Sequence, residues 1–152
     1  MAITASGLYG LTLEKMMIDT LGLSLESESV VFTMLVLDAL TPDFNAHDFR
    51  SDITANEVVT GAGYATGGIV ETATEVTLAG GVLTYDAVDA AWPASTITNA
   101  MAAVGYFKRG GADTLDELMW LSDFVTAASS SGGTFTVQWA AGGIFTVDFT
   151  PP

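Results

Sequence analysis

Hydrophobic and polar residues alternate most regularly near the C-terminus of the chain. In residues 134–140 the aromatic and β-branched side chains Phe135, Val137 and Trp139 share one face. Residues 144–149 alternate in the same way. A period of two is typical of β-strands that bury one face. We therefore predict that these two runs are paired strands joined by a short glycine-containing turn.

Further strands are predicted upstream of this pair. Residues 30–37 form a continuous apolar run, which is typical of a strand buried on both faces. Residues 69–79 and 82–86 flank a Gly-Gly pair, which is a hairpin signature. The remaining predicted strands are residues 95–98, 101–108 and 118–124. Roughly seven strands with glycine-rich turns predict an all-β fold, mainly an antiparallel β-sandwich or barrel.

One helix is predicted, over residues 11–21, because leucine, methionine and isoleucine recur there with Glu14 and Lys15 between them. Thr12 is the expected cap at its start and Gly22 its expected end. Residues 1–29 are predicted to be an N-terminal arm with the short helix, and residues 30–152 a single β-domain.

The charge balance changes what this β-protein is expected to do. Of 152 residues 18 are acidic and 4 are basic, which gives a net charge of -14 and 14% charged residues. Soluble domains carry about 25%. A surface so poor in charge indicates that other subunits cover much of it, or that glycine, alanine, serine and threonine form it. The few basic residues form no stripe, so we expect no nucleic-acid partner and no anionic membrane partner.

The sequence also lacks targeting and cofactor signals. The N-terminus has no basic segment followed by an apolar one, so we expect no signal peptide. Residues 90–107 and 124–147 are free of charge but too polar to span a bilayer. There is no cysteine, and therefore no disulfide framework. We expect no cofactor.

The candidate chemistry centres on the single histidine. His47 lies in a predicted loop with Asp43, Asp48 and Asp52 nearby in the sequence, and imidazole and carboxylate groups both bind metals and transfer protons. Residues 43–57 also offer oxygen ligands to calcium, although their spacing is not that of an EF-hand. The alternative, which we favour, is a structural loop in which the aspartates form Asx turns.

Other catalytic interpretations are weaker. With 18 acidic residues, carboxylate pairs for glycoside hydrolysis arise by chance. The glycines of residues 61–67 superficially match a dinucleotide-binding fingerprint, but no predicted helix follows them. Trp92, Trp120 and Trp139 could stack on a sugar, although core or interface packing is the interpretation we favour. We predict that the chain is not an enzyme and assign no catalytic, cofactor-binding or metal-binding residue.

Several segments resemble a known family. They are Thr41-Pro42-Asp43-Phe44-Asn45-Ala46-His47-Asp48-Phe49, residues 51–58, residues 61–68, residues 84–92 with 95–98, and residues 133–139 with 143–147. The chain is similar to a family of small virion structural proteins of tailed bacteriophages over most of its length from Val30 onward. The N-terminal residues 5–11 also fit the family, whereas residues 110–118 depart from it because they are more acidic and more apolar.

The resemblance implies a capsid decoration (cement) protein that binds the outer face of the major capsid shell, at the virion surface, and stabilises it. Its expected partners are the major capsid protein and further copies of itself, with a homotrimer favoured. Expected interface residues lie in the N-terminal arm and the glycine loop: Leu8, Tyr9, Leu11, Leu13, Gly61, Tyr64 and Gly67. We expect the acidic residues to face water, away from these contacts.

Two other hypotheses remain open from the sequence. The first is a tail-tube, head-tail connector or fibre-associated component of the same virion. The second is a hydrolase or carbohydrate-binding module that uses His47, Asp48 and the tryptophans.

Overall fold

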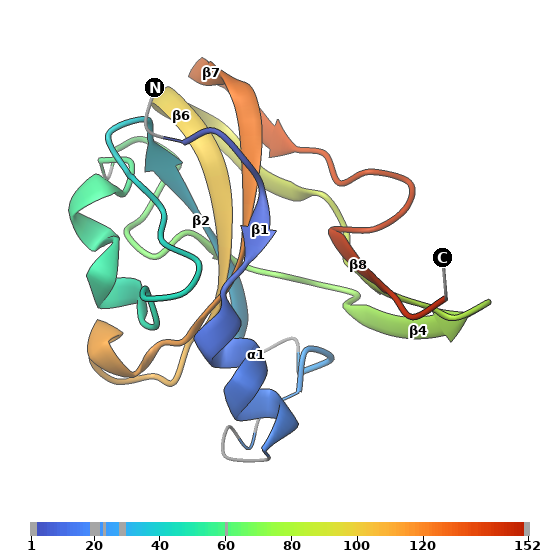
Figure 1. Cartoon of the computed structure of the whole chain (residues 1–152). Helices are drawn as coiled ribbons and strands as arrows, with labels where there is room; N and C mark the ends of the chain where they lie inside the picture. The colour runs from blue at the N-terminus through green and yellow to red at the C-terminus, as the bar shows by residue number, and fades with distance from the viewer. Residues whose placement is uncertain (1–2, 19–21, 23, 28–29, 60, 151–152) are drawn as a thin grey trace.

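Two antiparallel β-sheets of unequal size form the architecture (Figure 1). The structure is a computed structural model that describes residues 3–18, 22, 24–27, 30–59 and 61–150. Within these residues the larger sheet has five strands in the order β1-β7-β6-β2-β3, and the smaller sheet has three in the order β4-β5-β8. Every neighbouring pair of strands is antiparallel. The prediction of an all-β fold is confirmed.

A long hairpin forms the centre of the larger sheet. Its strands are β6 (Ala90–Phe107) and β7 (Leu118–Val137). The other strands of this sheet are β2 (Val31–Leu37), β3 (Ile69–Val70) and β1 (Gly7–Leu8). The last eight residues of β6 and most of β2 are buried, because both faces of the sheet are covered there. This burial explains why both segments are continuous apolar runs.

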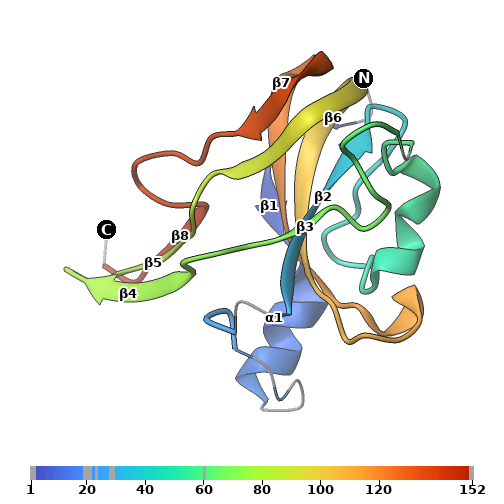
Figure 2. The same ribbon diagram turned by 180° about the vertical axis from the view of Figure 1, so that it is seen from behind.

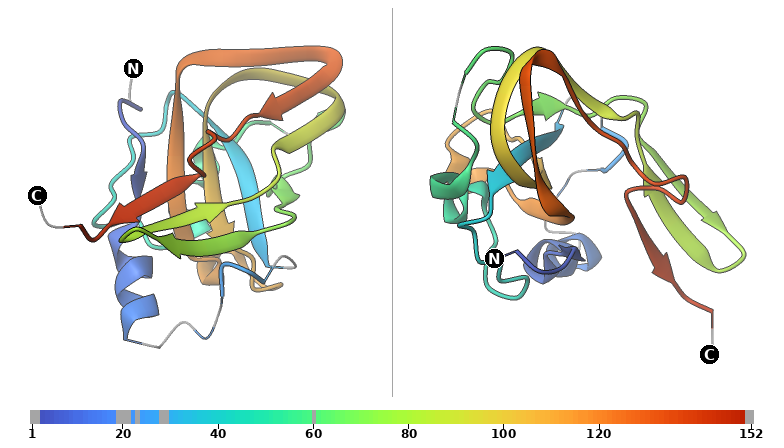
Figure 3. Two further views of the ribbon diagram at one scale, coloured as in Figure 1. Left: turned by 90° about the vertical axis from the view of Figure 1, so that its right-hand side faces the viewer. Right: turned by 90° about the horizontal axis from the view of Figure 1, so that it is seen from above.

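The outer half of the hairpin bends away from the rest of the sheet (Figure 3). The β6–β7 pairing shifts register at several points between Trp92 and Ala102. Ala94 and Asn99 on β6, and Val125 on β7, have positive φ values of 49°, 55° and 65°. Bulges of this kind increase the twist of a strand and change its direction. The two strands are thereby led from the larger sheet towards the smaller one.

The smaller sheet consists of β4 (Glu75–Ala79), β5 (Val82–Asp86) and β8 (Phe145–Asp148), and it lies to one side of the larger sheet (Figures 1 and 2). The predicted hairpin between β4 and β5 is confirmed, with a Gly-Gly turn in which both φ values are positive. Aromatic rings join the two sheets: the Trp120 ring centroid on β7 lies 5.2 Å from that of Tyr85 and 6.1 Å from that of Phe145.

Two predictions about the strands are wrong, one about pairing and one about the length of a strand. The C-terminal runs do not pair with each other, because the end of β7 pairs with the start of β6, while β8 pairs with β5 in the other sheet. Residues 69–79 do not form one strand, because β3 lies in the larger sheet and β4 in the smaller one. Alternation shows which face of a strand is buried, but it does not show which strand is its neighbour.

The one α-helix among the described residues, α1 (Gly10–Met17), is shorter than predicted. Its C-cap is Ile18, and residues 19–21 of the prediction lie outside the described residues. Thr12 is buried and does not cap the helix. Instead the amide of Gly10 donates to the carbonyl oxygen of Phe44 at 2.8 Å, so a tertiary contact takes the place of a side-chain cap.

The segment predicted as an N-terminal arm belongs to the larger sheet. Its strand β1 pairs with β7, and the side chains of Ile3 and Tyr9 are fully buried. Elsewhere the loops contain three short 3-10 turns, at Arg50–Asp52, Thr54–Asn56 and Asp113–Leu115.

Candidate functional site

The loop around His47 is organised by its own hydrogen bonds. The amide of Asp43 donates to Nδ1 of His47 at 3.3 Å, and Oδ1 of Asp43 accepts two amides of the following turn. Oδ2 of Asp52 accepts the amides of Asp48 at 2.8 Å and Phe49 at 3.0 Å. In the part of the chain that the structure describes, no three histidine or acidic side chains are grouped to hold a metal ion. The contacts are those of the structural loop that the sequence favoured.

The tryptophans lie mainly inside the molecule. Trp92 and Trp120 are 1% and 2% exposed, and Trp139 is half-buried. A ring that stacks on a sugar must present a face to the solvent. Core packing is therefore the observed role of Trp92 and Trp120.

A buried charged network lies beneath the loop. The guanidinium of Arg50 is 3.6 Å from the carboxylate of Glu57 and 3.3 Å from that of Asp116, and it lies over the ring of Tyr106. Both carboxylates are almost inaccessible to solvent. Glu57 and Asp116 lie far apart in the sequence, and no local pattern signals their common contact with Arg50.

The same network fastens the glycine loop to the larger sheet. Oε1 of Glu57 accepts the hydroxyl of Tyr64 at 2.9 Å and the amide of Gly67, and the hydroxyl of Tyr106 donates to the carbonyl oxygen of Gly67 at 2.7 Å. Burial raises the pKa of Glu57, while these hydrogen bonds and Arg50 act in the opposite direction. Tyr64 and Gly67 therefore make contacts inside the molecule that hold the glycine loop in place.

The expected interface residues fall into two groups. Tyr9, Tyr64 and Gly67 are buried within the chain. The others are at least partly exposed: Leu8, Leu11, Leu13 and Gly61. Their role in an interface stays a prediction.

An open apolar groove lies between α1 and the smaller sheet, with a volume of about 480 Å³. We call it the α1 groove. Eleven of its twelve lining residues are apolar: Leu8, Leu13, Met16, Met17, Leu25, Val76, Leu83, Met119, Phe145, Val147 and Phe149, with Ser24 the exception. Met17 and Phe149 are 80% and 65% exposed. The volume falls within the range of about 300–1,000 Å³ that is typical of binding sites.

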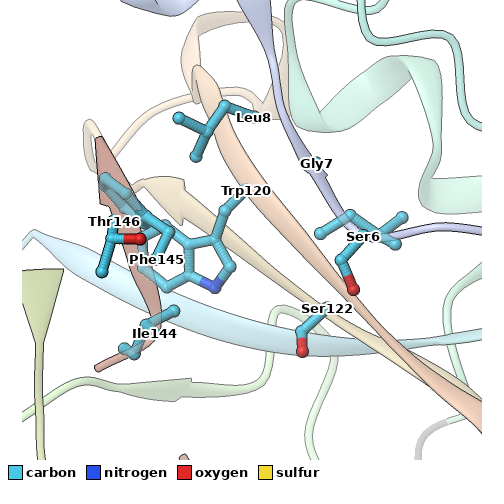
Figure 4. A pocket seen from close by; sticks show the side chains of 9 residues that line it. Ser6, Gly7, Leu8, Trp120, Ser122, Ile144, Phe145 and Thr146 are labelled. Atoms are coloured by element: carbon cyan, nitrogen blue, oxygen red, sulfur yellow. The ribbon is translucent and has the colours of Figure 1, made fainter. Parts of the chain in front are cut away.

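A smaller pocket adjoins the α1 groove (Figure 4). It has a volume of about 240 Å³ and is bounded by β1, β7 and β8, with the indole of Trp120 between β1 and β8. It shares the lining residues Leu8 and Phe145 with the α1 groove, so the two hollows are neighbours. Nε1 of Trp120 has no hydrogen-bond partner among the described residues.

A second apolar hollow, of about 400 Å³, lies on a different part of the surface. We call it the Val59 patch, because Val59 is 79% exposed there. Its lining residues carry no charge: Leu37, Val58, Val59, Gly61, Thr96, Thr98 and Asn99. Gly61, one of the expected interface residues, belongs to this patch.

The basic side chains are all engaged within the chain. Lys15 binds Asp48 at 2.6 Å, Arg109 binds Glu117 at 2.8 Å, and Lys108 lies over the ring of Phe32. Most described acidic residues face solvent, as expected, but four are buried: Glu57, Glu71, Asp116 and Glu117. The accessible charge of the molecule is therefore strongly negative.

Glu71 lies where the chain crosses from one sheet to the other, directly after β3. Its side chain is 1% exposed and accepts a hydrogen bond from the hydroxyl of Thr33. Burial raises the pKa of Glu71 to about 7, although the hydrogen bond from Thr33 opposes the shift. The crossing between the sheets thus contains a buried carboxyl group whose pKa lies near neutral pH.

No protein-family model matches the chain, and neither a curated protein nor a solved structure matches it. Among the described residues there is no helix that is both long and apolar enough to cross a membrane.

Proposed function

We propose that the chain is a structural protein of a bacteriophage virion, and specifically a capsid decoration protein that binds the outer face of the major capsid shell and stabilises it. The observation that carries the proposal is the α1 groove, an apolar hollow with exposed Met17 and Phe149 at its rim. Contiguous apolar surface of this kind is typical of protein interfaces. The resemblance of the sequence to small virion proteins supports the same conclusion.

The presence of two separate apolar surfaces suits a protein with two kinds of neighbour. We assign the α1 groove to the shell protein and the Val59 patch to contacts between copies in a homotrimer. None of the residues that line the Val59 patch is charged, so copies of this acidic chain can pack there without bringing lining carboxylates together. The acidic remainder of the surface would keep virions apart by repulsion.

Adding the purified protein to bare capsid shells tests this function. We expect co-sedimentation with the shells, a copy number that scales with the number of shell subunits, and a higher temperature of shell disruption. Native mass spectrometry should give a trimer that Val59→Glu dissociates. A single ring of copies at the neck or along the tail would instead identify a connector or tail component. A monomer that binds no shell would reject the proposal.

A further inference from the structure

We propose that the α1 groove binds an apolar segment of the partner protein that carries lysine or arginine residues beside its apolar side chains. This inference rests on the proposed function, because the segment is taken to belong to the shell protein. Beyond that function, it specifies which side chains of the segment, apolar and basic, the groove recognises.

The lining of the groove explains the apolar part of the segment. Met16, Met17 and Met119 supply flexible, polarisable side chains that adapt to different apolar partners. Phe145 and Phe149 on the opposite wall supply flat aromatic surfaces. The groove is open to solvent and has a volume of about 480 Å³, so it can hold more than one apolar side chain of a segment.

The surroundings of the groove explain the basic part. Two exposed acidic residues flank the groove: Glu14 follows the lining residue Leu13 on α1, and Oε1 of Glu26 accepts the amide of the lining residue Val76 at 3.1 Å. The only basic residue of these segments is Lys15, whose ammonium lies 2.6 Å from Asp48. Positive charge that complements this rim must therefore come from the partner.

The same charges disfavour a second copy of the chain as the occupant. Each copy carries a net charge of -14, so pairing two grooves would bring acidic rims together. Salt distinguishes the two cases, because screening weakens attraction between opposite charges and relieves repulsion between like charges.

Three labelled synthetic peptides test the inference by fluorescence anisotropy. The first combines leucine with flanking lysine, the second replaces its leucines with serine, and the third replaces its lysines with glutamate. We expect only the first to bind, with at least about a tenfold advantage over each of the others. Raising the salt concentration from about 0.05 M to about 0.5 M should weaken its binding several-fold.

A pair of variants localises the binding. Met17→Glu and Val125→Glu each place a carboxylate at an exposed apolar site, 80% and 70% exposed, and Val125 lines neither the α1 groove nor the Val59 patch. Met17→Glu should weaken peptide binding by at least about tenfold, while Val125→Glu leaves it unchanged. Circular dichroism should show that both variants are folded.

Several outcomes would overturn the inference. They are equal binding of the serine peptide, equal losses in the two variants, or self-association that Met17→Glu abolishes and salt strengthens. Shell co-sedimentation separates this inference from the proposed function. If the wild type and Met17→Glu bind shells equally, the groove inference fails and the function stands; if the wild type binds no shell, the function itself fails.

Discussion

The two sheets differ in how much of their own surface they bury. In the larger sheet, the last eight residues of β6 and most of β2 are buried, and a buried charged network holds the loops against them. In the smaller sheet, Tyr85 is the only strand residue that is fully buried, and Leu78 is 69% exposed. The larger sheet therefore forms its own core, while the smaller sheet leaves apolar surface uncovered and so forms one wall of the α1 groove.

The largest loss of stability is expected from a substitution at a glycine that packs closely against the larger sheet. A Cβ atom on Gly68 would lie 1.9 Å from the carbonyl oxygen of Thr33, and the φ of Gly68 is +70°. Because backbone must move to make room, Gly68→Ala should cost about 5 kcal/mol or prevent folding. Urea unfolding measures this cost. Gly142→Ala, where no heavy atom lies within 4 Å, should change stability by less than about 0.5 kcal/mol. A stable Gly68→Ala variant would contradict the packing described for this sheet.

The next largest loss of stability is expected when the buried charged network against the larger sheet is broken. Arg50→Met leaves the carboxylates of Glu57 and Asp116 buried without their cation, which should cost about 4 kcal/mol at neutral pH. Lys15→Met, which removes a half-exposed ion pair with Asp48, should cost less than about 1 kcal/mol. Denaturant midpoints of the two variants provide the comparison. Equal losses would show that the buried network contributes no more than a surface pair.

Single strands and tight turns could be predicted from the sequence better than the pairing of distant strands. The apolar run of β2 and the Gly-Gly turn between β4 and β5 are local signals, and both predictions are confirmed. The pairing of β8 with β5 is not local, because about sixty residues separate the two strands and the alternation of β8 fits any partner. The short strand β3 was not separated from β4 in the prediction, because the sequence does not show that the two strands pair in different sheets.

The candidate site was harder to predict. Leu8 and Leu13 were expected to make contacts, and both line the α1 groove. Met119 and Phe145 complete the groove from strands that are distant in the sequence, so no spacing signals their proximity. Tyr64 was expected on the surface, but its hydroxyl binds the buried Glu57. An aromatic residue among glycines has the same sequence pattern in an interface and in a core.

The buried carboxyl group of Glu71, where the chain crosses between the sheets, should make the free energy of unfolding depend on pH. The pKa of Glu71 is raised from 4.5 to about 7, so the folded protein binds a proton that the unfolded chain releases between these values. The contribution of Glu71 to stability is therefore complete below about pH 4.5 and is lost as the pH rises to about 7, by up to about 3 kcal/mol. Glu71→Gln should remove this dependence and be more stable than the wild type above pH 7.

Because other carboxylates also titrate, the quantity to measure is the difference in unfolding free energy between wild type and Glu71→Gln from pH 4 to pH 8. A difference that does not change with pH would show that Glu71 does not titrate in this range. Asp89, whose charge raises the pKa of Glu71, offers a check: Asp89→Asn should shift the transition to lower pH.

The smallest effect is expected in the smaller sheet, and it bears most directly on the contrast between the sheets. Gly80 and Gly81 have φ values of 58° and 82°, as in a type I′ turn, which disfavours alanine and tolerates asparagine. Gly80→Ala should therefore cost about 1 kcal/mol, and Gly80→Asn much less. Hydrogen exchange should show faster exchange in β4 and β5 of Gly80→Ala and unchanged exchange at the centre of β6, because a sheet with little buried surface opens locally. If the amides of β6 also exchange faster, and by the same factor, the two sheets unfold as one unit. The smaller sheet would then not open independently of the larger one.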